Sequence, residues 1–249
     1  MKYILRSVAQ SVAQNVEFVR RRIAAACLRA GRDPEEVTLV AVTKTVGGGL
    51  IKEAVQAGVR DVGENFVQEL LAKRESLGDD GIRWHFIGHL QSNKVRQIAG
   101  WIHLVHSVDS LSLASEISKK SAAAGKTAEI LIEVKTTGET TKFGVQPPEV
   151  LELAKKIGGL PNLKASGLMT IGPFLPDAES SRPSFRQLRS LRDLLASEGF
   201  GMTHLSMGMT NDFEVAIEEG ATIVRIGTAI FGPRIKPANE PIVKEGHRT

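Results

Sequence analysis

The stretch "VTLVAVTKTVGGGL", residues 37–50, is an apolar run that ends at Lys44 and continues into glycines 47–49. Its first part is short, rich in β-branched residues and free of charge before Lys44, which is typical of a strand buried on both faces. A lysine at the end of such a strand either marks the return of the chain to solvent or is an amine held within reach of a ligand. The rest of the sequence has to discriminate between these interpretations.

Seven further apolar runs follow along the chain and alternate with segments of helical periodicity. The runs are "VRDVG", "IRWHFIG", "WIHLVHSVD", "AEILIEV", "LKASGLMT", "THLSMG" and "TIVRIG", and the helical segments are 50–57, 64–77, 91–99, 109–124, 147–158, 182–198 and 211–219. Eight β/α units in about 200 residues predict an α/β fold, a single (β/α)8 TIM barrel. A doubly wound open sheet is the main alternative.

An amphipathic helix over residues 7–30 precedes the first strand and ends at Gly31. Its apolar stripe comprises Val12, Val16, Val19, Ile23 and Cys27. We therefore expect one domain over residues 1–232, the barrel with its N-terminal helix, followed by a loose tail over 233–249 that has proline and charge but no periodicity.

The composition, 42% hydrophobic and 24% charged, is that of an ordinary globular protein. The sequence shows no secretory h-region and no run of bilayer length, so we expect a cytoplasmic protein without a membrane partner. The single cysteine, Cys27, excludes an intrachain disulfide and a cysteine zinc cluster, and we interpret it as a packing residue. A net charge of +4 with few aromatic residues favours a phosphorylated small molecule over a nucleic acid.

Polar and glycine-rich clusters follow the carboxyl ends of the predicted strands, which is where barrels of this kind carry their chemistry. They are Lys44, "GENF" (63–66), "GHLQSNK" (88–94), "SVD" (107–109), "TTGETTKFG" (136–144), Met169 with Thr170, "SMGMTND" (206–212) and "RIGTAIFG" (225–232). We therefore expect the ligand site at this end of the barrel.

The last two clusters suggest a phosphate site. Ser206 and Gly208 follow the seventh run, and Gly227 and Thr228 follow the eighth, where a glycine lets backbone N–H groups approach an anion. Each residue alone could equally be a turn glycine or a helix cap, but their joint position after strands seven and eight favours phosphate.

Arg225 lies within the eighth apolar run and needs an acceptor because it does not shed its proton. The acceptor is either Glu64 or Glu133 in an internal ion pair, or a ring nitrogen or carboxylate of a ligand. His103 and His106 have odd spacing on one strand and face opposite sides, with no carboxylate placed to join them, so we expect no metal.

With these residues in place, the sequence resembles the pyridoxal 5′-phosphate (PLP) homeostasis protein family, small barrels related to the N-terminal domain of alanine racemase. The resemblance extends from about residue 7 to 232. It is carried by "AVTKT", "GENFVQE", "WHFIGHLQSNK", "GETTKFG", "LSMGMTNDFEVAIEEG" and "VRIGTAIFG".

This resemblance implies that Lys44 forms the aldimine with PLP. It implies further that Ser206, Gly227 and Thr228 hold the phosphate, that Gly208 shapes the loop and that Arg225 faces the pyridine nitrogen. Asn65 would lie near the ring, and Met169 would form part of the wall of the site.

The sequence departs from the family pattern at two places. Val46 and Gly47 replace the Lys-Pro that commonly follows the lysine motif, and Lys135 replaces an asparagine after strand five. Neither change removes the aldimine lysine or a phosphate contact, so we expect them to affect loop dynamics or a second ligand or partner site.

We expect a carrier that stores, protects or delivers PLP with little or no turnover, with PLP-dependent apo-enzymes as candidate recipients. An arginine at the ring nitrogen disfavours the fully protonated pyridinium, and the one tyrosine, Tyr3, lies at the N-terminus. The alternatives are a small PLP-dependent amino acid racemase and a Schiff-base aldolase acting on a sugar phosphate. We expect a monomer, because a closed barrel leaves no edge strand.

Overall fold

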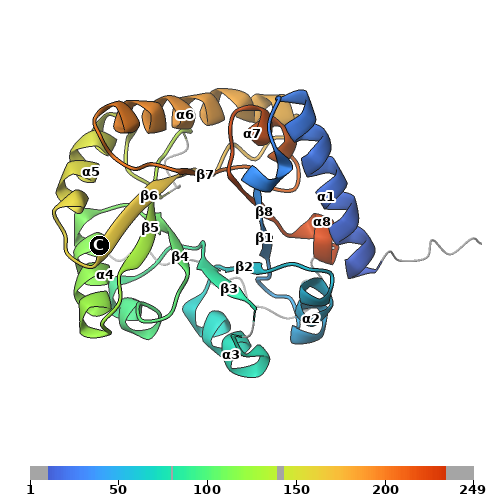
Figure 1. Cartoon of the computed structure of the whole chain (residues 1–249), viewed down its shortest axis with the longest axis horizontal. Coiled ribbons are helices and arrows are strands. Elements are labelled where there is room, and N and C mark those ends of the chain that lie inside the picture. The colour runs from blue at the N-terminus through green and yellow to red at the C-terminus, as the bar shows by residue number, and fades with distance from the viewer. Residues whose placement is uncertain (1–10, 80, 139–142, 234–249) are drawn as a thin grey trace, which may run out of the picture.

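The structure, a computed structural model, describes residues 11–79, 81–138 and 143–233, and its strands form a closed parallel barrel (Figure 1). The strands pair in sequence order, and residues 223–226 of the last strand pair with residues 38–41 of the first. The (β/α)8 prediction is therefore confirmed and the open-sheet alternative is excluded. The strands are β1 (Thr38–Val42), β2 (Asp61–Glu64), β3 (Arg83–Phe86), β4 (Leu104–Val108), β5 (Ala128–Glu133), β6 (Leu163–Met169), β7 (His204–Ser206) and β8 (Ile223–Ile226).

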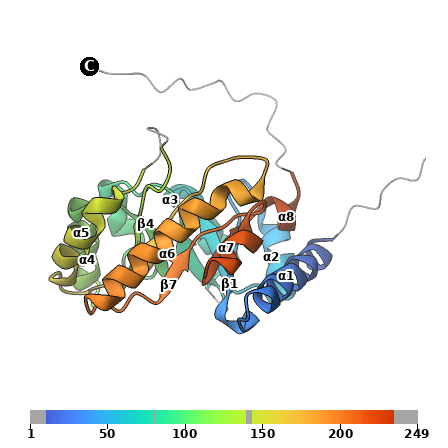
Figure 2. The same ribbon diagram turned by 90° about the horizontal axis from the view of Figure 1, so that it is seen from above.

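Helices connect the strands and surround the barrel. Figure 2 shows α5, α6, α7 and α1 following one another along one side. The helices are α1 (Val12–Arg29), α2 (Gly48–Gln56), α3 (Val67–Leu77), α4 (Leu111–Ala123), α5 (Val150–Gly158), α6 (Arg182–Ser197), α7 (Phe213–Glu218) and α8 (Thr228–Phe231). Among them, no helix is both long and apolar enough to cross a membrane, as far as the described residues extend.

Two predicted helices differ in the structure. The segment 91–99 forms the 3₁₀ helix η2 (Ser92–Gln97), whose Ser and Asn residues favour local backbone bonds over a longer α-helix. The segment 147–158 begins as the 3₁₀ helix η3 (Pro147–Glu149), which has prolines in its first turn, and continues as α5.

The extra helix α1 begins at the cap Ser11 and covers the last elements of the barrel, α7 and α8 (Figure 1). Arg22 binds Glu214 of α7 at 3.0 Å, and the Asn15 amide donates to the Ile230 carbonyl at 2.9 Å. The buried stripe comprises Val12, Val16, Val19, Ile23, Ala26 and Cys27, so the packing role predicted for Cys27 is confirmed. Residues 1–10 and the part of the predicted tail from 234 to 249 lie outside the described residues.

Alternate strand residues separate two cores, as expected for a closed barrel. A small cluster lies inside the barrel, and its five members each come from a different strand: Val40, Leu104, Leu131, Met169 and Ile223. The neighbouring positions, among them Ala41, Val105 and Val224, belong to the larger core between strands and helices. The inner cluster leaves room inside the barrel for the buried polar residues described next.

Candidate functional site

Lys44 lies two residues beyond the carboxyl end of β1, in a tight turn. The Val46 N–H donates to the Thr43 carbonyl at 2.9 Å, and Thr45 adopts a positive φ of 63°. A β-branched residue in this conformation is strained, and its surroundings must hold it there.

A buried cation provides that support. The Lys73 ammonium lies 2.6 Å from the Glu64 carboxylate, 2.6 Å from the Glu69 carboxylate and 2.5 Å from the Thr43 carbonyl. The Glu69 carboxylate also accepts the Thr45 N–H at 2.6 Å. This group, Lys73, Glu64, Glu69, Thr43 and Thr45, is called the Lys73 network below. It fixes the backbone on both sides of Lys44.

The Lys73 network was missed in the sequence, and it corrects one interpretation. Glu64 was considered as an ion-pair partner of Arg225, but its carboxylate accepts from Lys73 and, at 2.5 Å, from the Thr43 hydroxyl. Burial raises the pKa of Glu64 above its usual value, against the lowering effect of these two bonds. Glycines 48 and 49 begin α2, with Gly47 as its N-cap.

The loops after β7 and β8 meet at the same end of the barrel. The Thr228 hydroxyl donates to the Thr210 hydroxyl at 3.1 Å, which joins the two loops. Gly208 has φ 89°, and a Cβ there would lie 2.5 Å from Cβ of Ala216, so only glycine fits without a shift. Gly227 caps the first turn of α8. Gly208, Gly227 and Thr228 therefore lie on the two loops that follow β7 and β8, and that they hold a phosphate stays a prediction.

Arg225 reaches the same region from inside the barrel. Its two terminal nitrogens donate to the Ser206 hydroxyl at 2.6 Å and to the Thr170 carbonyl at 2.9 Å. Its acceptors are therefore neutral oxygens, and the ion pair considered with Glu64 or Glu133 is not what holds it. Burial lowers the pKa of Arg225 to about 10, against the charges of Glu133 and Asp212.

Glu133, at the end of β5, is the most perturbed carboxyl group near this arginine. Burial, with the nearby charge of Asp109, raises its pKa to about 7, although Arg225 acts in the opposite direction. A buried carboxyl group that titrates near neutrality at the carboxyl end of a barrel is a candidate for proton exchange with a ligand.

Asn65 and Met169 lie where the sequence placed them, after β2 and at the end of β6. The Asn65 side-chain oxygen is buried and has no hydrogen-bond partner among the described residues. Such an orphaned acceptor indicates that a ligand or water completes the site. Met169 packs in the inner cluster with Val40 and Ile223.

The histidines do not lie apart as the sequence predicted. The rings of His103 and His106 both contact His85, with ring centres 5.1 and 5.2 Å away. His103 precedes β4, so the alternation of side chains along that strand does not fix the side on which its ring lies.

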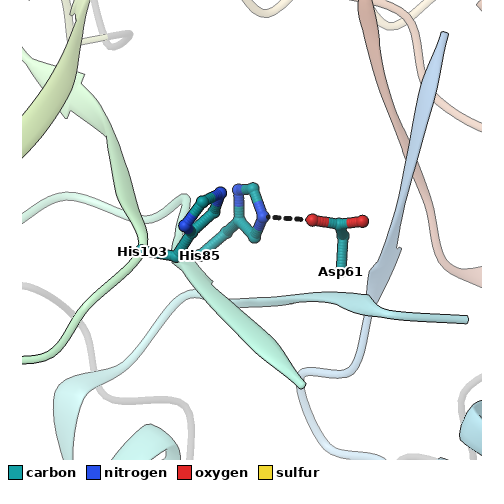
Figure 3. Close-up of side chains that lie close together, drawn as sticks. All are labelled: Asp61, His85 and His103. Atoms are coloured by element: carbon teal, nitrogen blue, oxygen red, sulfur yellow. Dashed lines mark hydrogen bonds and ion pairs between the residues drawn. The ribbon is translucent and has the colours of Figure 1, made fainter. Parts of the chain in front are cut away.

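A carboxylate lies close to two of these histidines, His85 and His103, although the sequence analysis found none placed to join His103 and His106. Asp61 lies 2.9 Å from His85, and Figure 3 shows the two side chains pointing toward one another, with His103 beside His85. The ligand atoms of these three residues lie within 4.8 Å of one another. That no metal binds stays a prediction.

Comparisons with known proteins agree with this geometry. Residues 10–235 match the family described as alanine racemase, N-terminal domain. A relative from Aquifex aeolicus, named pyridoxal phosphate homeostasis protein, is 48% identical over 90% of this chain and 99% of its own length.

Two solved structures are similar as well. The crystal structure of an unknown protein from Bifidobacterium adolescentis has a TM-score of 0.84 and 42% identity, covering 88% of this chain and 94% of its own. The structure of PipY from Synechococcus elongatus with PLP bound has a TM-score of 0.76 and 34% identity, covering 86% of this chain and 100% of its own. The chain therefore belongs to the pyridoxal phosphate homeostasis protein family, within the alanine racemase N-terminal domain fold.

Proposed function

We propose that this protein binds PLP as an aldimine with Lys44 and acts in PLP homeostasis, by storage, protection or delivery, with little or no turnover. The observation that carries the proposal is the convergence of Lys44, Arg225 and the Gly227 loop at one end of the barrel, in a family with a PLP-bound relative. PLP supplies a reactive aldehyde, and a lysine imine holds it reversibly.

The residues of the site fit PLP. Gly227 and Thr228 would bind the phosphate on the loop shaped by Gly208, while Arg225 would face the pyridine nitrogen. Asn65, whose side-chain oxygen is an orphaned acceptor, would lie near the ring, and Met169 would close the site from inside the barrel. Ser206 was predicted to bind the phosphate, but its hydroxyl already accepts from Arg225. We therefore assign Ser206 the role of supporting Arg225 before that of binding the phosphate.

We expect low turnover because of the groups that hold and move protons at the site. A guanidinium donates a hydrogen bond to a ring nitrogen but keeps its proton, which weakens the ring as an electron sink. The alternative, a small amino acid racemase, needs a second group that moves protons, and Glu133 with its pKa of about 7 is the residue that favours it.

The proposal is tested by borohydride reduction of the PLP-loaded protein and peptide mass spectrometry. We expect the phosphopyridoxyl group on Lys44 and its loss in Lys44→Ala, with Lys52→Ala as the control on an exposed lysine of the next helix. A loaded protein with unmodified Lys44 contradicts the aldimine. Racemisation of alanine or serine near the median enzymatic rate of about 10 s⁻¹ contradicts the carrier.

We infer further that the protein acts as a monomer in the cytoplasm and passes PLP to apo-enzymes. The closed barrel supports the monomer, because every strand has both neighbours. Light scattering of the loaded protein tests this, and a concentration-dependent dimer mass contradicts it.

A further inference from the structure

A continuous series of buried hydrogen bonds crosses the inside of the barrel, from the first residue of β2 to the arginine of the ligand site. Asp61 lies 2.9 Å from Nε2 of His85, and Nδ1 of His85 lies 2.9 Å from Nε2 of His106. Nδ1 of His106 lies 2.9 Å from the Ser206 hydroxyl, which is 2.6 Å from Arg225. None of the five residues is more than 5% exposed. We call this group the Asp61–Arg225 network.

The ionised Asp61 at one end and neutral histidine rings between the ends together fix the direction of every bond. Arg225 has only N–H donors, and an ionised Asp61 has only acceptors. With both histidine rings neutral, the Ser206 hydroxyl donates to Nδ1 of His106. Nε2–H of His106 then donates to Nδ1 of His85, whose own Nε2–H donates to Asp61.

When both histidines are neutral, each hydrogen bond of the network has one hydrogen and one acceptor. A second proton on either ring would require the Ser206 hydroxyl to turn its hydrogen away from His106 and to accept from that ring instead. Burial lowers the pKa of both His85 and His106, whereas the bonds from His85 and Arg83 lower the pKa of Asp61 despite its burial. Arg83 binds the second Asp61 oxygen at 2.5 Å, so the carboxylate is satisfied on both sides.

We propose that Asp61, His85 and His106 are positioning residues for the PLP site at the opposite end of the barrel. They orient the Ser206 hydroxyl so that its hydrogen points to His106 and its oxygen accepts from Arg225. This accounts for the fixed direction of the guanidinium, whose other terminal nitrogen binds Thr170. Ser206 has one hydrogen, so it supports Arg225 and is not a donor to the ligand phosphate.

The inference rests on the proposed function for the identity of the ligand, but the direction of the network is measurable without PLP. Nitrogen-15 NMR of the ligand-free chain with labelled histidine should show His85 and His106 protonated at Nε2 only. A proton on Nδ1 of either ring, or an imidazolium at pH 7.5, overturns the network as drawn.

The effect on the ligand site is tested by PLP titration followed by absorbance. His106→Leu cuts the network, and we expect PLP to bind about fivefold more weakly with a shifted absorption maximum. Asp61→Asn should act in the same direction by about twofold, because one amide oxygen cannot serve both His85 and Arg83.

Two variants serve as controls. His103→Leu removes a ring that touches His85 outside the network, and Glu129→Gln removes a carboxylate at the start of β5 that binds Lys164 instead. Both should keep the wild-type affinity and spectrum.

If Asp61→Asn and His106→Leu match these controls, the positioning role is wrong. If the wild type itself fails to bind PLP, the proposed function is wrong, while the NMR result still tests the hydrogen-bond directions in the network. If His106→Leu does not fold, the titration of Asp61→Asn tests the positioning role.

Discussion

Both buried networks begin on the short strand β2, at its two ends, yet they are built differently. The Lys73 network starts at Glu64 and places one ammonium 2.6 Å from each of two carboxylates. The Asp61–Arg225 network starts at Asp61 and separates its cation from its anion by three neutral groups.

This difference indicates two ways of using buried charge. Adjacent opposite charges hold a short piece of backbone, here the strained turn around Lys44. Separated charges joined by neutral groups give each intervening hydrogen bond a direction, and they transmit orientation across the barrel. Variants that remove one member of each network sharpen the comparison.

The largest expected effect is on the Lys73 network. Lys73→Met leaves the fully buried Glu64 carboxylate without its cation, which should lower the free energy of unfolding by about 3–5 kcal/mol in urea denaturation. Lys120→Met is the matched control, because Lys120 pairs with Glu116 at the same helical spacing but on the surface. It should cost less than about 0.5 kcal/mol. Equal losses in the two variants would contradict the anchoring role.

The next effect concerns Glu133, the carboxyl group close to Arg225. Its folded pKa of about 7 lies above the reference 4.5, so the folded state holds the proton more tightly and loses stability as the pH rises from 4.5 through 7. The loss approaches about 3 kcal/mol above pH 7, and Glu133→Gln should remove it. Urea denaturation of the ligand-free protein at pH 5 and pH 8 measures the difference.

The control for this pH dependence is Glu129→Gln at the other end of β5. Although burial acts to raise it, the pKa of Glu129 is lowered by bonds with Ser166 and Lys164, so this variant should show no gain at pH 8. If Glu133→Gln has the same pH profile as the wild type, the raised pKa is wrong.

The smallest effect is expected for a neutral member of the Asp61–Arg225 network. Ser206→Ala leaves Arg225 and His106 each without one partner, and we expect a loss of about 2 kcal/mol. Ser118→Ala, which removes a single bond to the Pro161 carbonyl, should cost about 1 kcal/mol. Thermal unfolding of both variants makes the comparison, and a Ser206 loss below that of Ser118 would contradict the network.

The barrel and the positions of Lys44, Gly208 and Thr228 could be predicted because their patterns are local. Apolar runs, helical periodicity and the residues that follow each strand are read within a few positions. Even there, the segment predicted as one helix from residue 147 begins as a 3₁₀ turn, and α5 starts at Val150. Local patterns therefore predict the barrel fold and the end of the barrel where the ligand site is expected.

The partners of these residues could not be predicted in the same way. His106 meets Ser206 from 100 positions away, and Lys73 reaches the carbonyl of Thr43 from 30 positions away. Such contacts depend on which strands and helices face one another across the closed barrel. The odd spacing of His103 and His106 predicted side chains on opposite sides of one strand, although both rings contact His85.

The position of α1 has a consequence for synthesis on the ribosome. This helix is synthesised before the barrel, yet two of the helices that it packs against, α7 and α8, come after β7 and β8, and β1 likewise completes its pairing with β8. A nascent chain that ends before β8 keeps an apolar helix stripe uncovered and leaves β1 with one neighbour. Closure of the barrel therefore requires almost the whole chain, and the interval before release is when this protein is most exposed to aggregation.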